Sequence, residues 1–325
     1  MAMTTSDDTD SPGIPTDGVE RLSRRQLLIR RFLRNRLAVA GVIVLFGLVA
    51  VVLIAPMLYP WDHATVDRGV FREPPQGGWR FWQWFGGDHW FGTTQSGNDM
   101  FALSLRGLRV SLMIGFAVAI VSTTIAAVVG SFAAYFGGAF ERAALWTIDL
   151  LLIIPAFLIV GIIMSRQGAG LPLFSALPGP VLLVIVLSIL SWMLAARVVR
   201  SMTMTVKQND YVTAARYMGV SGPRIVFRHI LPNVASLLII DSTLAVAYAI
   251  LAESSLSYFG LGLQTPDTSL GTLIGQNWRA AVPAPWLFWF PAGLLIIVVT
   301  AVNFVGDGLR DAMDPASSSN ESADS

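Results

Sequence analysis

Val110–Phe140 reads VSLMIGFAVAIVSTTIAAVVGSFAAYFGGAF and contains no Asp, Glu, Lys or Arg. At a rise of 1.5 Å per residue, about 20 apolar helical residues cross the ~30 Å hydrocarbon core of a membrane. The same absence of charge recurs in Leu37–Trp61, Gln167–Ala196 and Ala280–Gly306. Each of these four stretches is therefore long enough to cross a membrane as a helix.

Two further apolar stretches each carry one acidic residue. Ala143–Ser165 contains Asp149, and Ile230–Ala252 contains Asp241. An acid at the bilayer centre costs about 2.5–3.5 kcal/mol on insertion scales, which the surrounding apolar residues can offset. Only 13% of the chain is charged, against about 25% in a soluble domain. We therefore predict an all-α polytopic membrane protein with six transmembrane helices.

Basic residues are distributed unequally between the two sides that six spans would create. Seven arginines lie in Arg21–Arg36 before the first span, and six basic residues lie between the fourth and fifth spans. With Arg142 and Arg310, 15 of the 22 basic residues fall on one side and seven on the other. The positive-inside rule makes the richer side cytoplasmic, so we expect both termini in the cytoplasm.

Composition divides the chain into five regions. Residues 1–19 and 316–325 are polar and rich in Ser and Asp, which is typical of disordered tails; the first is expected in the cytoplasm. Residues 20–61 hold the basic segment and the first span. Residues 62–109 form a long external segment, and residues 110–315 form a core with the other five spans.

The external segment is rich in aromatic residues and ends in a helix signal. Seven Trp and Phe residues lie between Trp79 and Phe91; they suit an interfacial aromatic belt or, alternatively, a docking surface for an external partner. Ser96–Asp99 then precede the amphipathic run Met100–Arg109. Capping residues before such a run are typical of a helix start. We expect a short elbow helix there, lying along the membrane before the second span.

Residues 201–229 are too polar to cross a membrane but are patterned as two short helices. Thr203–Met218 can form the first, and Gly219 suits the residue that follows a helix end. Ser221 is then an N-cap for a second helix that runs towards Pro232. The sequence predicts two short cytoplasmic helices joined by a tight glycine turn.

The same segment resembles the cytoplasmic loop of bacterial ATP-binding-cassette (ABC) importer permeases. The family pattern is E-A-A, three residues, G, nine residues, then I-x-L-P. Here Thr213-Ala214-Ala215, Gly219 and His229-Ile230-Leu231-Pro232 keep those spacings. Thr213 replaces the glutamate of the family and so removes a carboxylate that could make a charged contact with the ATPase, and His229 replaces the first isoleucine.

Other motifs are similar to those of C-type permeases of dipeptide and oligopeptide importers, and the resemblance covers about residues 28–315. In His89–Asp99, Thr94 and Asn98 replace the Asp and Arg of the family motif. The motifs are HWFGTTQSGND (89–99), RVSL (109–112), ESSLS (253–257), GLG (260–262), GDGLRD (306–311) and DP (314–315).

This resemblance implies a type I ABC importer permease fold in a bacterial cytoplasmic membrane. It implies a homologous permease subunit that completes a pathway for di- or oligopeptides, and an external substrate-binding protein that delivers them. It also implies two ABC ATPase subunits or domains, which hold the ATP and Mg²⁺, and no nucleic-acid partner. The 201–229 loop would couple this chain to the ATPase. The coupling residues implied are Thr213, Ala214, Ala215, Arg216, Gly219, Val220, Leu231 and Pro232.

Three acidic residues are candidates for the pathway or a gate. Asp149 could belong to a proton relay, but pairing with Arg142, about two turns away on the same helix face, is the interpretation we favour. Asp241 lies near mid-span and is the better candidate for lining the pathway. Glu253, near the external end of its span, could contact substrate or lie in a helix interface.

Several chemistries are excluded by the residues present. A phosphate-binding P-loop needs Gly-Lys-Ser/Thr, and the only lysine, Lys207, follows Val206. The three histidines are scattered and cysteine is absent, so we expect no catalytic residues, no metal site and no cofactor on this chain.

Other functions remain open. An importer of this class could carry nickel, glutathione or haem-like cargo instead of peptides. An ion-coupled secondary transporter would need several buried ionisable residues and inverted repeats. A non-transporting membrane anchor would not require the patterned loop.

Overall fold

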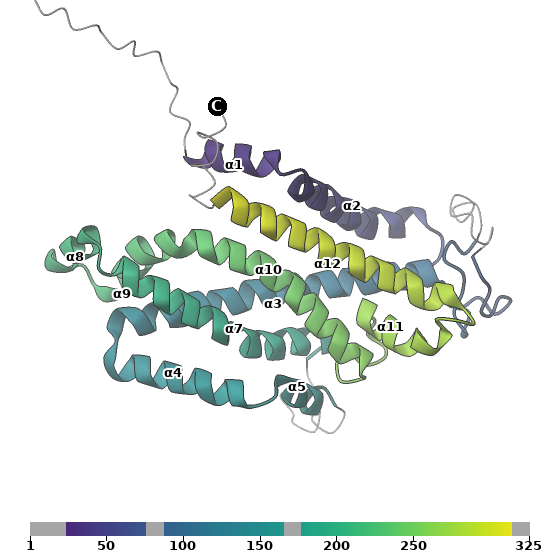
Figure 1. Cartoon of the computed structure of the whole chain (residues 1–325). Coiled ribbons are helices and arrows are strands. Elements are labelled where there is room, and N and C mark those ends of the chain that lie inside the picture. Colours follow the sequence, from purple (N-terminus) through teal and green to yellow (C-terminus); the bar gives the residue numbers. More distant parts are fainter. Residues whose placement is uncertain (1–23, 76–87, 166–176, 314–325) are drawn as a thin grey trace, which may run out of the picture.

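The computed structural model describes residues 24–75, 88–165 and 177–313, and every regular element in these ranges is a helix. This confirms the all-α class for the described residues (Figure 1). The predicted tails (1–19 and 316–325), most of the aromatic cluster and the start of the predicted fourth span at Gln167 lie outside them.

Five helical segments are long and apolar enough to cross a membrane, and they coincide with five of the six predicted spans. The five are α2 (Arg36–Leu58), α3 (Met100–Phe136), α7 (Gly179–Val206), α10 (Leu231–Tyr258) with the turns that precede it from Gly222, and α12 (Pro285–Met313).

The remaining predicted span, Ala143–Ser165, is broken. It consists of α4 (Gly138–Ile153) and α5 (Ala156–Met164), which are bent by 75° relative to each other. Pro155 accounts for the break because it has no N–H and disfavours a helical conformation in the residue before it. Ile154 is accordingly extended, with φ −80° and ψ 126°. The described residues thus give six spans only if this bent pair is counted as one.

The predicted elbow helix is wrong. α3 begins at Met100 and continues without interruption to Phe136, so the amphipathic run forms its first turns. The start itself is predicted correctly, because the Asp99 carboxylate accepts a hydrogen bond from the Ala102 N–H at 2.7 Å. No Pro interrupts α3, and Leu108 on the apolar face of these turns is fully buried in the core.

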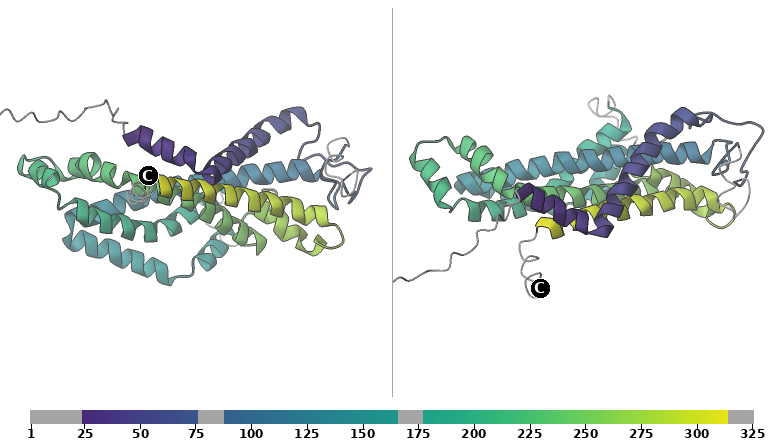
Figure 2. Two further views of the ribbon diagram at one scale, coloured as in Figure 1. Left: turned by 45° about the horizontal axis from the view of Figure 1, so that its top comes forward. Right: turned by 90° about the horizontal axis from the view of Figure 1, so that it is seen from above.

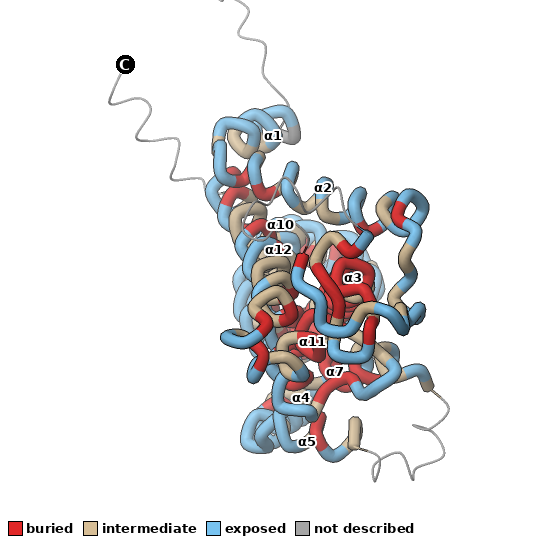
Figure 3. The backbone as a smooth tube through the Cα atoms, turned by 90° about the vertical axis from the view of Figure 1, so that its right-hand side faces the viewer, coloured by how far each residue is buried: buried red, intermediate tan, exposed pale blue. Residues whose placement is uncertain are grey.

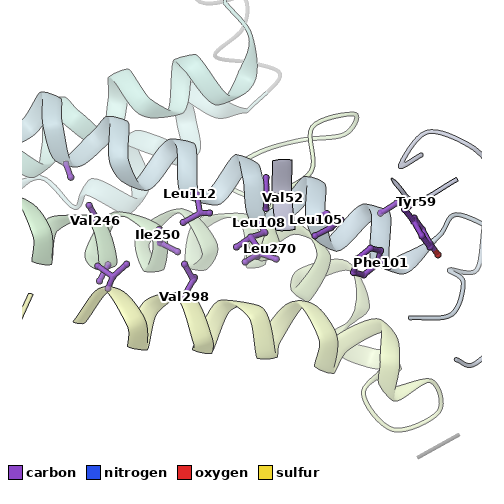
Figure 4. Close-up of a cluster of buried hydrophobic side chains, with 14 residues drawn as sticks. Val52, Tyr59, Phe101, Leu105, Leu108, Leu112, Val246, Ile250, Leu270 and Val298 are labelled. Atoms are coloured by element: carbon purple, nitrogen blue, oxygen red, sulfur yellow. The ribbon is translucent and has the colours of Figure 1, made fainter. Parts of the chain in front are cut away.

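The core lies around α3, which packs most extensively against α7 and α10. Figure 4 shows side chains of α3, such as Leu112, meeting Ile250 of α10 and Val298 of α12. The helices approach closely because small residues line their contacts: a Cβ on Gly130 would lie 2.5 Å from the Ala196 carbonyl oxygen of α7. Figure 3 shows burial concentrated on α3, while α2 is exposed over most of its length.

The two ends of the bundle carry different segments. α8 (Asp210–Tyr217) and α9 (Gly222–Ile225) lie at one end. The described residues between α2 and α3, 59–75 and 88–99, lie at the other end, together with α11 (Leu270–Asn277); Figures 1 and 2 agree on this. The basic helix α1 (Arg24–Arg34) lies at the periphery and leads into α2.

Candidate functional site

The predicted turn at Gly219 is a helix C-cap of the Schellman type. The Gly219 N–H donates to the Arg216 carbonyl, and the Val220 N–H donates to the Ala215 carbonyl, both at 3.1 Å. Gly219 has φ 77°, a conformation that glycine adopts without the steric cost of a Cβ. The predicted end of the first loop helix is therefore confirmed, although α7 runs to Val206 and the loop helix itself begins only at Asp210.

The second loop helix does not end at Pro232. α9 continues through a π-helical turn, η3 (Val226–Ile230), directly into α10. Pro232 has no N–H for the carbonyl four residues earlier, and such a missing bond favours local widening of a helix. Ser221 occupies the N-cap position of α9 as predicted, but its side chain makes no capping hydrogen bond. We refer to residues 208–230 as the hairpin.

The hairpin has its own small core against the end of α3. Its buried members share an apolar character and pack with Phe132 and Tyr135 of α3. The Lys207 ammonium group donates to the carbonyl oxygens of Ala134 and Tyr135, at 3.1 and 2.7 Å, and so satisfies the last carbonyls of that helix. The buried residues of the hairpin are Val212, Ala215, Ile225, Val226 and Ile230.

Ala214 and Ala215 do not form one surface patch. Ala214 is exposed, whereas Ala215 is 2% exposed and lies within the hairpin core. The exposed face of the hairpin carries Thr213 and Arg216, and its tip presents Tyr217, which is 88% exposed. Of these two alanines, only Ala214 is therefore available to an outside partner.

A cavity of about 590 Å³ lies between α3, α4, α7 and α10. Its walls are mostly apolar, with polar groups from Ser122, Ser191, Asp241 and Tyr248. Asp241 thus lies on the wall of this cavity, and its place in a pathway stays a prediction. α7 and α10, which meet at this cavity, are also the two helices that the hairpin connects.

Asp149 does not pair with Arg142. Its carboxylate contacts the guanidinium of Arg197 on α7, while Arg200 on the same helix contacts Glu141 of α4. These pairs hold α4 against α7, and the interpretation of Asp149 as a helix-interface acid survives with a different partner.

Glu253 lies in the protein interior and not on the cavity. Its side chain is fully buried and accepts hydrogen bonds from the hydroxyls of Ser111 at 3.0 Å, Ser257 at 2.8 Å and Ser254 at 3.3 Å. The Ser111 oxygen in turn accepts from the Leu270 N–H at 3.2 Å. This network joins α3, α10 and the start of α11.

Sequence reasoning missed the role of these serines, although the signal was present. Ser111 belongs to the RVSL motif, and Ser254 and Ser257 belong to the ESSLS motif. The two motifs lie far apart in the sequence and meet at Glu253. In the residues that the structure describes, no group of three or more His, Cys, Asp or Glu side chains could hold a metal ion.

The described helices define a polytopic membrane protein, and comparison with known proteins places it more closely. The family model for binding-protein-dependent transport system inner membrane components matches residues 126–319. The model for the N-terminal transmembrane domain of oligopeptide transport permease C matches residues 23–75. The chain therefore belongs to the family of binding-protein-dependent transport system inner membrane components.

Individual relatives agree with this placement. The oligopeptide transport system permease proteins OppC of Mycobacterium bovis and Mycobacterium tuberculosis are each 44% identical to this chain over 300 residues, which cover 92% of this chain and 97% of the relative. OppC of Bacillus subtilis is 33% identical over 301 residues, which cover 91% and 92%.

Proposed function

We propose that this chain is one of two membrane subunits of an ATP-driven importer of oligopeptides. The observation that carries the proposal is 44% identity, over 92% of this chain, to proteins named as oligopeptide transport permeases. A homologous permease completes the pathway, an external binding protein delivers the peptide, and both termini of this chain lie in the cytoplasm. ATP and Mg²⁺ bind to two separate ATPase subunits.

The hairpin is the proposed contact with the ATPase. Its exposed tip offers Tyr217 and Met218, which are 88% and 76% exposed, and Thr213 and Ala214 lie on the adjoining exposed face. Large exposed apolar side chains at the end of a bundle fit a protein interface. Ala215, Val220 and Leu231, which belong to or pack on the hairpin core, support this surface from behind.

A displacement of the hairpin can be transmitted to the proposed pathway by a short route. α9 continues through η3 into α10 without a break, and α10 carries Asp241 on the cavity wall. At the other end of the hairpin, Lys207 holds the end of α3. Closure of the ATPase pair would therefore tilt α10 and α7 together and change the cavity between them.

Uptake in cells tests the proposal. In a strain without its own peptide importers, expression of this chain with its partner subunits should restore accumulation of a labelled oligopeptide, and unlabelled oligopeptides should compete. If nickel, glutathione or haem competes and peptides do not, the proposed cargo is wrong while an importer remains. If the purified chain hydrolyses ATP in the absence of ATPase subunits, the proposal that ATP hydrolysis occurs on separate subunits is wrong.

A further inference from the structure

A second, smaller pocket lies at the other end of the bundle, between the last turns of α2 and the first turns of α3. Its volume is about 160 Å³, well above the space that a single water needs. It shares no lining residue with the cavity around Asp241. The lining residues are Val52, Pro56, Tyr59, Trp61, Asp62, His63, Ala102, Leu105, Arg106 and Arg109.

Two arginines give the pocket a positive lining. Arg106 and Arg109 are three residues apart on α3, so they lie on neighbouring turns of one helix face. Arg106 is half-buried and Arg109 is exposed. Across the described ranges, neither guanidinium has a hydrogen bond or an ion pair. The half-buried guanidinium of Arg106 has lost part of its hydration without gaining a counter-ion, which costs free energy. The exposed Arg109 adds a second positive charge beside it, so the pair favours a bound anion.

Asp62, the carboxylate among the lining residues, forms no ion pair with these arginines in the described part of the chain. Asp62 accepts a hydrogen bond from the His63 N–H at 2.7 Å and also contacts the His63 ring. The arginine pair is thus left for a ligand.

The pocket lies at the boundary between the apolar spans and the polar end segments. Arg109 immediately precedes the charge-free stretch that starts at Val110, and Pro56 lies in the last turns of α2. Tyr59 and Trp61 add aromatic side chains of the kind enriched at membrane interfaces. Phospholipid phosphate groups lie at the border between the hydrocarbon core and water. Pro56 is exposed at the edge of the pocket, whereas Val52, Ala102 and Leu105 are buried behind it.

We propose that this pocket binds the phosphate of a phospholipid in the leaflet at this end of the bundle, which is the outer leaflet in the orientation proposed above. Arg106 and Arg109 donate hydrogen bonds to the phosphate oxygens, for which the planar guanidinium is well suited. Pro56, which is exposed at the edge of the pocket, contacts the glycerol and the first acyl carbons. The bound lipid holds α2 against α3.

Lipid binding can be measured on the assembled transporter purified in detergent. The probes are a short-chain phosphatidylglycerol, the corresponding diacylglycerol without phosphate, and inorganic phosphate. Native mass spectrometry reports retained lipid, and thermal denaturation reports stabilisation. The test variant is Arg106→Gln/Arg109→Gln. The matched control is Arg68→Gln/Arg279→Gln, which removes two arginines from the same end that do not line the pocket.

We expect the phospholipid to bind and stabilise the native protein, and the test variant to bind at least about tenfold more weakly, as the loss of charge-assisted hydrogen bonds implies. The control should bind within about twofold of the native protein. If the test variant fails to assemble, the variant Arg106→Lys/Arg109→Lys replaces it in the binding measurement. This variant keeps both positive charges but loses the bidentate geometry of the guanidinium, so it should bind the phospholipid more weakly than the native protein does.

Equal binding of diacylglycerol, or unchanged phospholipid binding in the arginine variants, would overturn the proposal. Inorganic phosphate that protects as well as the phospholipid at the same concentration would overturn the assignment to a lipid. None of these measurements uses transport, so lipid binding that persists in a protein without peptide uptake would count against the proposed function alone.

Discussion

Gly219 is the residue at which a single added carbon atom should have the clearest functional effect. Its φ of 77° is strained for any residue with a Cβ, although the space around it is open. Gly219→Val should therefore cost roughly 1 kcal/mol locally and misdirect α9 relative to α8. We expect normal insertion of the protein in the membrane, weaker retention of the ATPase and loss of uptake, measured together by membrane abundance, co-purification and transport.

Gly260 provides the matched control for this substitution. It has φ 74°, and a Cβ there would also meet nothing within 4 Å, but it follows α10 at the opposite end of the bundle. Gly260→Val should carry a similar backbone cost and leave ATPase retention intact. Equal ATPase retention and uptake in both variants would show that the hairpin is not the coupling element.

Substitution of Glu253 should mainly lower stability, whereas substitution of Asp241 should mainly lower transport. Glu253→Ala leaves the hydroxyls of Ser111 and Ser257 without their buried acceptor, which costs about 2 kcal/mol and should lower the Tm in detergent by a few degrees. Asp241→Ala, at a half-buried position on the cavity, should lower uptake with little change in Tm. The reverse pattern would contradict the assignment of Asp241 to the pathway.

At the residue scale, local signals could be predicted and distant pairings could not. The cap at Asp99 and the turn at Gly219 depend on neighbours within a few residues, so both could be predicted from the nearby sequence. Arg197 contacts Asp149 across 48 positions, and Ser111 binds Glu253 across 142. Such pairings depend on how α3, α7 and α10 pack, and no local pattern encodes that.

At the scale of elements, the length and apolarity of a stretch were sufficient to predict the long helices but not to predict how neighbouring helices are joined. The run Met100–Arg109 is amphipathic because one face is buried in the protein, and the same pattern would arise from a helix lying on a membrane. Similarly, Pro232 suggests a helix boundary. The π-helical turn η3 accommodates the proline, and the helix continues into α10. Periodicity cannot distinguish these cases because both satisfy the same hydrophobic pattern.

The continuous connection between the hairpin and α10 gives a prediction about stiffness. Arg228 is exposed within η3, so its replacement removes no core contact. Arg228→Gly should weaken the helical link by about 1 kcal/mol relative to Arg228→Ala, which loses the same charge. We expect the glycine variant to retain its ATPase but to import less peptide per ATP hydrolysed than the alanine variant. Equal coupling ratios in the two variants would mean that α10 is not the transmitting element.

At the scale of the whole molecule, the arrangement of the ends agrees with the predicted topology. The hairpin lies at one end and the 59–75, 88–99 and α11 segments lie at the other, as alternating spans require. Which end faces the cytoplasm follows from the excess of arginine on the hairpin side, a property of sequence that packing does not determine. The orientation therefore remains a prediction with its own test.

Cysteine labelling can decide this orientation, because the native chain contains no cysteine and gives no background. Ser96 and Val282 are exposed at one end of the bundle, and Ser221 is exposed on the hairpin at the other. A membrane-impermeant maleimide should label Ser96→Cys and Val282→Cys in intact cells. It should label Ser221→Cys only after the membrane is permeabilised. Labelling of Ser221→Cys in intact cells, with Ser96→Cys protected, would show that the protein has the opposite orientation in the membrane. The hairpin would then lie outside the cell, where no cytoplasmic ATPase can reach it.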